Sequence, residues 1–191
     1  MACKMIIILL GPPGAGKGTQ AKMICKKKKL FHFSTGEILR NEVEKKTKIG
    51  EKIDQIINEG RLVSDDIIIS IVEKIISEEF SKNDGILFDG FPRNLDQANA
   101  FEELLNKVGK KIDCVLHITI DKDEVVERIK KRGLEENRKD DNSEILKSRI
   151  EVYLKETSPL INLYKKKNIL EKIDGMKSIE NVNNDINKIL N

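Results

Sequence analysis

Residues 5–20 read MIIILLGPPGAGKGTQ, an apolar run that leads straight into a glycine-rich loop. The run from Met5 to Leu10 has the length of a buried strand, and a helical pattern follows the loop. The loop from Gly11 to Lys17 satisfies the spacing GxxxxGK, which needs a strand before it and a helix after it. Backbone amides in such a loop point at phosphate oxygens, and the lysine reaches the outer phosphates. The stretch therefore predicts a nucleotide-phosphate site.

The loop departs from the common pattern at Gly18, where many loops of this kind carry a Ser or Thr hydroxyl that holds Mg²⁺. Thr19 has a hydroxyl, but one position further along the helix. We therefore expect Mg²⁺ to depend on nucleotide phosphates, water and a carboxylate elsewhere. Asp89, directly after the apolar run Ile86–Phe88, is the candidate for a contact through water.

The composition argues against several classes of partner. The chain has 191 residues, enough for one domain with a buried core. Its 35 Lys and Arg nearly balance its 32 Asp and Glu, so the net charge of +3 does not favour nucleic acid. No apolar run approaches the roughly 18 residues of a membrane helix. The three cysteines lack a CxxC spacing, which favours neither disulfides nor zinc. We expect a cytoplasmic protein with no nucleic-acid or membrane partner.

Strand-like apolar runs alternate with helical patterns along the chain. We predict strands at Met5–Leu10, Phe31–Phe33, Ile86–Phe88, Cys114–Ile120 and Ile169–Ile173. This alternation predicts an α/β fold of three layers, with a mostly parallel sheet covered by helices on both faces. Two regions interrupt it. Ser34–Val63 reads as two helices broken near Gly50, and Gly133–Asp141 reads as a polar, charged loop.

Several separated motifs resemble the adenylate kinase family of nucleoside monophosphate kinases. They are GPPGAGKGTQ, HFSTGEILR at His32–Arg40, EGRLVSD at Glu59–Asp65 and DGFPRNLDQA at Asp89–Ala98, with further similarity at Arg128–Gly133, Arg138–Tyr164 and Lys172–Gly175. In that family GKGT is usual at the end of the phosphate loop. The resemblance implies a single P-loop domain over residues 1–191 with five parallel strands. It also implies a helical monophosphate-binding insertion at 34–63 and a lid at 131–141. The lid is the short form without cysteines, so no structural zinc is expected.

The same resemblance implies the reaction MgATP + AMP = 2 ADP, performed by a monomer. The residues expected at the ATP site are Gly14, Ala15, Gly16, Lys17, Gly18, Thr19, Arg128, Arg132 and Lys177. Those expected at the AMP site are Thr35, Arg40, Arg61, Leu62, Val63, Gly90, Arg93, Gln97, Arg138 and Arg149. Those expected to act in catalysis are Lys17, Arg93, Arg132, Arg138 and Arg149. Planar guanidinium groups suit phosphate oxygens, and transfer needs aligned, neutralised substrates more than covalent chemistry.

Two positions favour AMP over UMP or CMP as the acceptor. Relatives that act on AMP carry Thr in STG and Gln four residues after the arginine of GFPR, and this chain has Thr35 and Gln97. A Gln amide donates and accepts in one plane, as the adenine edge requires. Asn94 is more typical of the pyrimidine relatives. A UMP/CMP kinase of the same family therefore remains the alternative reading.

A non-catalytic nucleotide sensor or GTPase-like switch is the more distant alternative. Switch proteins carry a guanine-selective NKxD motif, and the stretch NKVG at Asn106–Gly109 lacks its Asp. A sensor also has little use for several arginines around a second phosphate.

Overall fold

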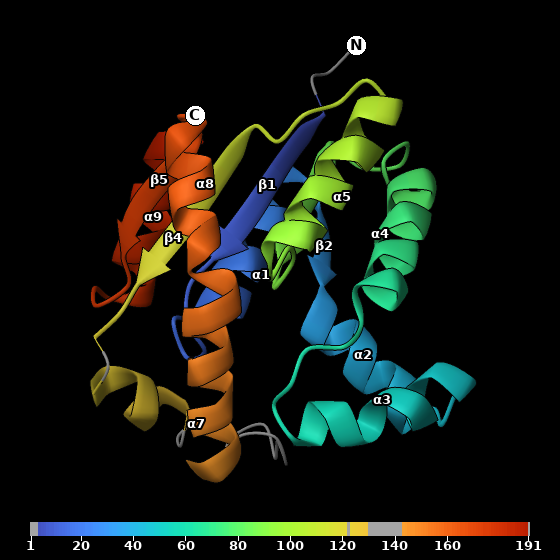
Figure 1. The fold of residues 1–191 in the computed structure, drawn as a ribbon. Coiled ribbons are helices and arrows are strands. Elements are labelled where there is room, and N and C mark those ends of the chain that lie inside the picture. Colours follow the sequence, from blue (N-terminus) through green and yellow to red (C-terminus); the bar gives the residue numbers. More distant parts are fainter. Residues whose placement is uncertain (1–3, 122, 130–142, 191) are drawn as a thin grey trace.

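The sheet holds five parallel strands in the order β2-β3-β1-β4-β5 (Figure 1). The computed structural model describes residues 4–121, 123–129 and 143–190. The strands are β1 (Met5–Leu10), β2 (Phe31–Ser34), β3 (Gly85–Asp89), β4 (Cys114–Thr119) and β5 (Leu170–Asp174). All five were predicted, with ends shifted by a residue at most. The predicted fold class, a three-layer P-loop α/β fold, is therefore confirmed.

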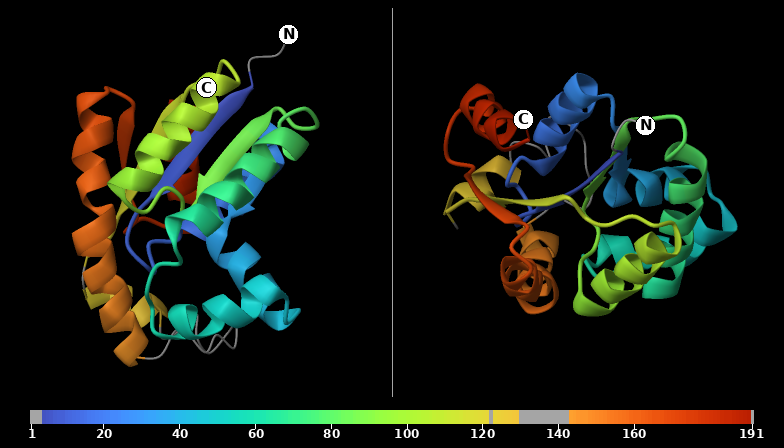
Figure 2. Two further views of the ribbon diagram at one scale, coloured as in Figure 1. Left: turned by 45° about the vertical axis from the view of Figure 1, so that its right-hand side comes forward. Right: turned by 90° about the horizontal axis from the view of Figure 1, so that it is seen from above.

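Alternate residues of β1 pack into two separate apolar layers. Ile6 and Ile8 join the layer under α4 (Asp65–Glu79), α5 (Leu95–Lys107) and α8 (Pro159–Lys166). Ile7 and Leu9 join the layer under α1 (Lys17–Lys28) and α9 (Ile179–Ile189). The right-hand view of Figure 2 shows the sheet between these two sets of helices. Because both faces are covered, β1 is apolar throughout instead of alternating with polar residues.

The helical segments after β4 run past the end of the sheet. Residues 123–129 are helical, and α7 (Ser143–Val152) continues through a π-helical turn, η2 (Tyr153–Thr157), into α8. Figure 1 shows α7 and α8 as one long column that extends beyond the carboxyl ends of the strands. None of the helices that the structure describes is both long and apolar enough to cross a bilayer.

Four phenylalanines fix the carboxyl ends of β2 and β3 against α5. The ring centroids of Phe33 and Phe88 are 5.2 Å apart, and those of Phe88 and Phe101 are 4.7 Å apart. Phe91, just beyond β3, lies 5.1 Å from Phe101. All four side chains are fully buried. Tilted and edge-on aromatic pairs of this kind hold the loop after β3 in place.

The region between β2 and α4 forms α2 (Thr35–Glu44) and α3 (Lys48–Asn58). Two helices with a break near Gly50 were predicted there, and the observed break lies at residues 45–47, just before this glycine. The chain turns at Lys46, whose φ is 49°, and Thr47 caps α3 by accepting a hydrogen bond from the Gly50 amide at 3.0 Å. Gly50 lies inside α3, where a Cβ would stand 2.0 Å from the Glu42 carbonyl oxygen. This glycine allows close packing of α3 on the end of α2 and does not break a helix.

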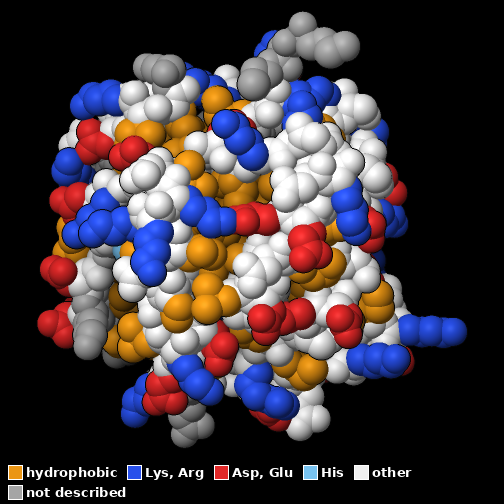
Figure 3. All heavy atoms as spheres, turned by 45° about the horizontal axis from the view of Figure 1, so that its top comes forward, with side chains coloured by type: hydrophobic (Ala, Val, Ile, Leu, Met, Phe, Trp, Pro, Cys, Tyr) orange, Lys and Arg blue, Asp and Glu red, His pale blue; other side chains and the backbone are white. Residues whose placement is uncertain are grey.

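Charged groups of both signs are interspersed on the surface in Figure 3, beside exposed hydrophobic side chains. The near balance of acidic and basic residues in the sequence thus extends to this face, which has no large field of one sign.

We predict that Gly50→Ala destabilises the protein by about 1–3 kcal/mol, because the added methyl group has no room against the Glu42 carbonyl. Urea unfolding followed by circular dichroism measures the change. Lys52→Ala, at an exposed position of the same helix, is the matched control. Equal free energies of unfolding for the two variants would contradict the packing role of Gly50.

Candidate active site

The loop between β1 and α1 has the backbone of a phosphate cradle. Gly14 and Gly16 adopt φ values of 80° and 85°, in the left-handed region that glycine reaches without strain. Gly16 is the N-cap of α1. The free amides of the first helical turn and the positive end of the helix dipole therefore face the space that the loop encloses. The Lys17 ammonium donates to the carbonyls of Gly11 at 2.7 Å and Pro12 at 2.9 Å. Loop amides and a lysine therefore converge at one place.

Gly18 lies directly opposite Asp89. A Cβ at Gly18 would stand 3.6 Å from Oδ2 of Asp89, so a larger side chain would occupy the space in front of the carboxylate. The two come together because β1 and β3 pair in parallel, with Leu9 opposite Asp89. The absence of a hydroxyl at position 18 thus leaves open the space between the phosphate loop and this carboxylate.

Asp89 is a buried carboxylate held in its charged form. Burial by itself raises its pKa, but His32, Lys17 and Arg93 together outweigh this effect and lower the pKa below its ordinary value. Nε2 of His32 lies 3.6 Å from Oδ2 of Asp89, and has no hydrogen-bond partner among the described residues. The positive groups come from both directions, since Lys17 belongs to the phosphate loop and Arg93 to the loop after β3. Asp89 therefore lies between two cationic sites.

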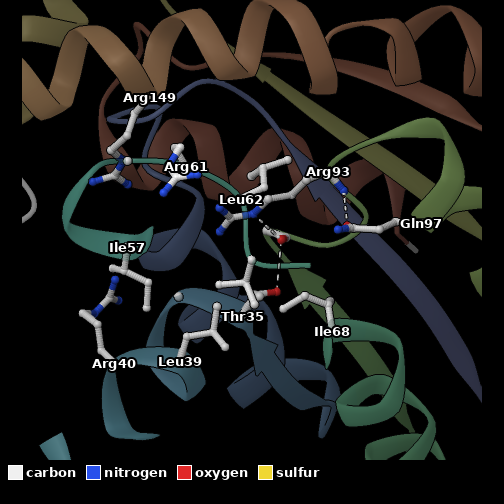
Figure 4. A pocket seen from close by; sticks show the side chains of 14 residues that line it. Thr35, Leu39, Arg40, Ile57, Arg61, Leu62, Ile68, Arg93, Gln97 and Arg149 are labelled. Atoms are coloured by element: carbon white, nitrogen blue, oxygen red, sulfur yellow. Dashed lines mark hydrogen bonds between the residues drawn. The ribbon is translucent and has the colours of Figure 1, made fainter. Parts of the chain in front are cut away.

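A cavity opens beside this carboxylate, and 14 residues line it (Figure 4). Nine of these were predicted at the AMP site: Thr35, Arg40, Arg61, Leu62, Val63, Gly90, Arg93, Gln97 and Arg149. They come from α2, the α3–α4 loop, the β3–α5 loop and start of α5, and α7. The structure thus brings together residues spread over more than half of the sequence, and their roles in binding stay predictions.

Arg93 is held in place by the backbone of the β3–α5 loop. Its Nε donates to the Gly90 carbonyl at 2.7 Å, and a Cβ at Gly90 would stand 3.0 Å from its Nη2. Burial, together with the positive charges of Arg149 and Arg40, lowers the pKa of Arg93 to about 10, and the negative charge of Asp89 opposes this shift. The group remains protonated at neutral pH. Its burial among like charges makes this a favourable place for an anion.

Three more arginines reach the cavity from different elements. Arg40 of α2 lies over Gly36, where a Cβ would stand 3.1 Å from its Nη1. Arg61 forms an ion pair with Glu59 at 2.6 Å, and Arg149 of α7 lies near Arg61 at the same end of the cavity (Figure 4). Gly60 makes this position possible, because a Cβ there would stand 3.0 Å from Cγ of Arg149. The Ser148 hydroxyl also donates to the Glu59 carbonyl at 3.0 Å, so the α3–α4 loop is closed onto α7.

The two residues predicted to choose the base are both tied to the β3–α5 loop. The Thr35 hydroxyl donates to the Gly90 carbonyl at 3.0 Å. Oε1 of Gln97 accepts from the Arg93 amide at 2.8 Å (Figure 4). Asn94 does not line the cavity. Its side-chain oxygen caps α5 by accepting from the Gln97 amide at 2.7 Å, so its part here is structural.

Other residues of the site were missed by the sequence reasoning. The cavity is also lined by Gly36, Leu39, Ile57, Gly60 and Ile68. Leu39, Ile57 and Ile68 belong to apolar faces of helices, where their periodicity indicates core packing and not a ligand. Gly36 and Gly60 lie inside the motifs HFSTGEILR and EGRLVSD. Their place in these motifs was the sequence feature that could have assigned them to the site. His32 was given no functional role, and its approach to Asp89 follows from the pairing of β2 with β3.

The predicted ATP-site residues divide into those the structure places and those it does not describe. Gly14 to Thr19 form the loop and the start of α1. Arg128 donates through Nη1 to the Gly175 carbonyl at 2.9 Å and pairs through Nε with Glu124 at 2.7 Å. Lys177 is exposed and pairs with Asp185 of α9 at 2.7 Å. Arg132, Arg138 and the predicted lid at 131–141 lie wholly within 130–142, outside the described residues.

The described residues contain no group of three or more His, Cys, Asp or Glu side chains arranged around a metal. Asp89 was predicted to hold Mg²⁺ through water, and this role stays a prediction. This ion keeps several waters and is usually bound through one or two carboxylates together with substrate phosphates. A single charged carboxylate facing a phosphate loop meets that description.

A parallel sheet with a glycine cradle after β1, a lysine folded over it and an arginine-walled cavity alongside defines a P-loop phosphotransferase. The family model for adenylate kinase matches residues 9–169. An adenylate kinase of Prochlorococcus marinus is 48% identical over 184 residues, which cover 96% of this chain and 97% of the relative. The adenylate kinase of Thermobifida fusca is 42% identical over 178 residues, which cover 93% and 94%. The chain belongs to the adenylate kinase family.

We predict that Asp89→Asn flattens the acid limb of the stability curve. The folded-state pKa of Asp89 lies below its ordinary value of 3.8, so the unfolded chain takes up this proton first. The carboxylate's contribution is therefore complete above about pH 5 and is lost as the pH falls through the folded-state pKa. Urea unfolding between about pH 6 and pH 3 should show a smaller loss for the variant than for the wild type.

The exposed Asp66→Asn variant is the control for removal of one negative charge, and its curve should follow that of the wild type. If the curves of wild type and Asp89→Asn fell in parallel, Asp89 would not be held charged by its neighbours.

Proposed function

We propose that this chain is an adenylate kinase that transfers the terminal phosphoryl group of MgATP to AMP and forms two molecules of ADP. One observation carries the proposal. Asp89 interacts with Lys17 of the phosphate loop and with Arg93 of the arginine-walled cavity, so the two cationic sites meet at one carboxylate. Two sites for phosphate that share one border fit a donor and an acceptor bound end to end.

The cavity takes the monophosphate acceptor. Arg93 and Arg149 come from opposite walls and interact electrostatically, as do Arg93 and Arg40. Guanidinium groups from three elements surround a phosphate better than one mobile lysine, because each offers a rigid planar fork. The α3–α4 loop and α7 contact each other and both line this cavity, and exclusion of water from it would favour transfer over hydrolysis.

The phosphate loop takes the triphosphate donor. Loop amides and the start of α1 hold the phosphates, and Lys17 neutralises charge on the outer ones. Arg128 is held against the Gly175 carbonyl, which places a cation next to the turn where we expect the donor base. Arg132 and Arg138 belong to the predicted lid and would complete the positive wall.

Transfer forms one P–O bond and breaks another. An oxygen of the acceptor phosphate attacks the terminal phosphorus of the donor, and the bond to the bridging oxygen breaks as ADP leaves. The arginines and Lys17 stabilise the charge on the transferring group, a contribution of roughly 10³–10⁵ in rate for a single arginine in related systems. Mg²⁺, when bound with ATP, neutralises further charge on the phosphates, and Asp89 would hold it through water.

AMP is the acceptor that the base-side residues favour. Gln97 lines the cavity and has an amide that matches the adenine edge, whereas Asn94 is occupied as the cap of α5. The feature that raised a UMP/CMP kinase as the alternative is thus accounted for by helix capping. We also propose a monomer in the cytoplasm, with free nucleotides as its only partners.

Steady-state assay of the purified protein with ATP and each of AMP, CMP and UMP tests the proposed function. We expect kcat/KM to be highest for AMP, with ADP as the product of both substrates. A higher value for CMP or UMP would support the alternative kinase, and no turnover with any acceptor would support a non-catalytic nucleotide sensor.

We predict that Arg93→Ala lowers kcat/KM for AMP by about 10³-fold or more, because the guanidinium that we propose faces the phosphates is lost. Circular dichroism should remain that of the folded protein. Arg93→Lys keeps the charge but loses the planar fork, and should recover only part of the activity. Near-normal turnover of Arg93→Ala would remove Arg93 from the mechanism.

A further inference from the structure

The amide of Gln97 is held by two partners of opposite kind. Its Oε1 accepts from the Arg93 amide at 2.8 Å, and its Nε2 donates to Oδ1 of Asp65 at 2.7 Å. An amide N–H can only donate, and an ionised carboxylate can only accept. Each partner therefore fits one end of the Gln97 amide and repels the other end.

A reversed Gln97 amide would lose both hydrogen bonds at once. Its oxygen would face the Asp65 carboxylate and its NH₂ group would face the Arg93 N–H. Gln97 is only 2% exposed, so water does not compensate for the lost partners. The side chain consequently has one orientation, with one N–H and one oxygen lone pair still unused by these two partners.

Asp65 is itself held in place by a further residue, Asn94. Nδ2 of Asn94 donates to its Oδ1 at 3.1 Å and to its Oδ2 at 3.2 Å. Asn94 cannot turn around, because its Oδ1 caps α5 by accepting from the Gln97 backbone amide at 2.7 Å. Asp65, Asn94 and Gln97 thus form a closed set of hydrogen bonds between the start of α4 and the start of α5.

We propose that Asp65 is a positioning residue for base selection: it fixes the orientation of the Gln97 amide, so that the acceptor site distinguishes a 6-amino purine from a 6-oxo purine. This rests on the proposed function, in which Gln97 meets the adenine edge. Adenine presents an amino donor beside a ring-nitrogen acceptor. Hypoxanthine has the same shape but presents an oxygen acceptor beside an N–H donor.

A freely turning glutamine would pair with either base, because reversal of its amide exchanges donor and acceptor. A glutamine locked by Asp65 pairs with only one of them. The AMP-to-IMP ratio of kcat/KM therefore reports on the lock itself, and a change in overall stability or turnover does not alter it.

The alternative is a purely structural role for Asp65, as an acidic residue in the first turn of α4 that complements the helix dipole. Asp66 shares this role, because it occupies the next position of the same turn and is exposed. It does not take part in the hydrogen bonds around Gln97. Asp66→Asn is therefore the matched control for the loss of one negative charge at this helix end.

The test measures kcat and KM for AMP and IMP, with ATP as donor, in the wild type, Asp65→Asn and Asp66→Asn. Asn at position 65 keeps the size of the side chain but can donate as well as accept, so the restraint on Nε2 is lost and only that of the Arg93 amide on Oε1 remains. We expect the AMP-to-IMP ratio of kcat/KM to fall about tenfold in Asp65→Asn, through a higher KM for AMP with little change in kcat. The ratio in Asp66→Asn should equal that of the wild type.

Two outcomes would overturn the inference. One is an Asp65→Asn variant in which AMP and IMP lose activity equally or not at all, which would leave Asp65 a structural role only. The other needs no variant: a wild-type protein that uses IMP as well as AMP has no such lock. A wild type inactive toward AMP would instead overturn the proposed function. If Asp65→Asn does not fold, Asp65→Ala and the wild-type ratio provide the same decision.

Discussion

The parallel pairing of β1 with β3 is the constraint on which the site depends. It places Leu9 opposite Asp89, so the loops that follow the two strands leave the sheet side by side at its carboxyl edge. One loop is the phosphate cradle and the other carries Gly90, Arg93 and the start of α5. In open α/β sheets ligands bind at this edge, where the chain switches from one side of the first strand to the other. Here β3 and β4 lie on the two sides of β1.

Positively charged groups gather at this edge of the sheet, and this arrangement favours the binding of a polyanion. Burial opposes the charge on Arg93, and Arg40 and Arg149 oppose it further, while Asp89 only partly compensates. The fold tolerates this arrangement because the phenylalanine cluster and the buried strands supply stability elsewhere. Preorganised positive groups need little rearrangement when negative charge develops on a transferring phosphoryl group. The energetic cost of assembling the cations is thus met during folding and not during the reaction.

Arg93 connects the parts of the site that we propose hold the phosphate and the base of the acceptor. Its side chain donates to the Gly90 carbonyl, its amide donates to Gln97, and its carbonyl accepts from the Thr157 hydroxyl at 2.7 Å in the π-helical turn. The loop after β3 is thereby fixed to α5 and to the column that carries Arg149. A shift at either helix would move the phosphate contact and the base contact together. This coupling explains why the acceptor site is built around one loop although its residues come from several elements.

The sequence by itself determined the strands, the phosphate loop and the candidates for the acceptor site, because these depend on local spacing and apolar periodicity. It also placed the break between α2 and α3 a few residues late, near Gly50, and did not indicate that this glycine lets the two helices touch. Only the tertiary structure decided that Gly18 faces Asp89, that Gly60 makes room for Arg149 and that Asp65 holds the Gln97 amide. Asp65 and Gln97 are separated by the whole of α4 and β3, and in sequence Asp65 reads only as an acidic helix start. Contacts of this kind arise from strand order and helix packing, which no local pattern of residues specifies.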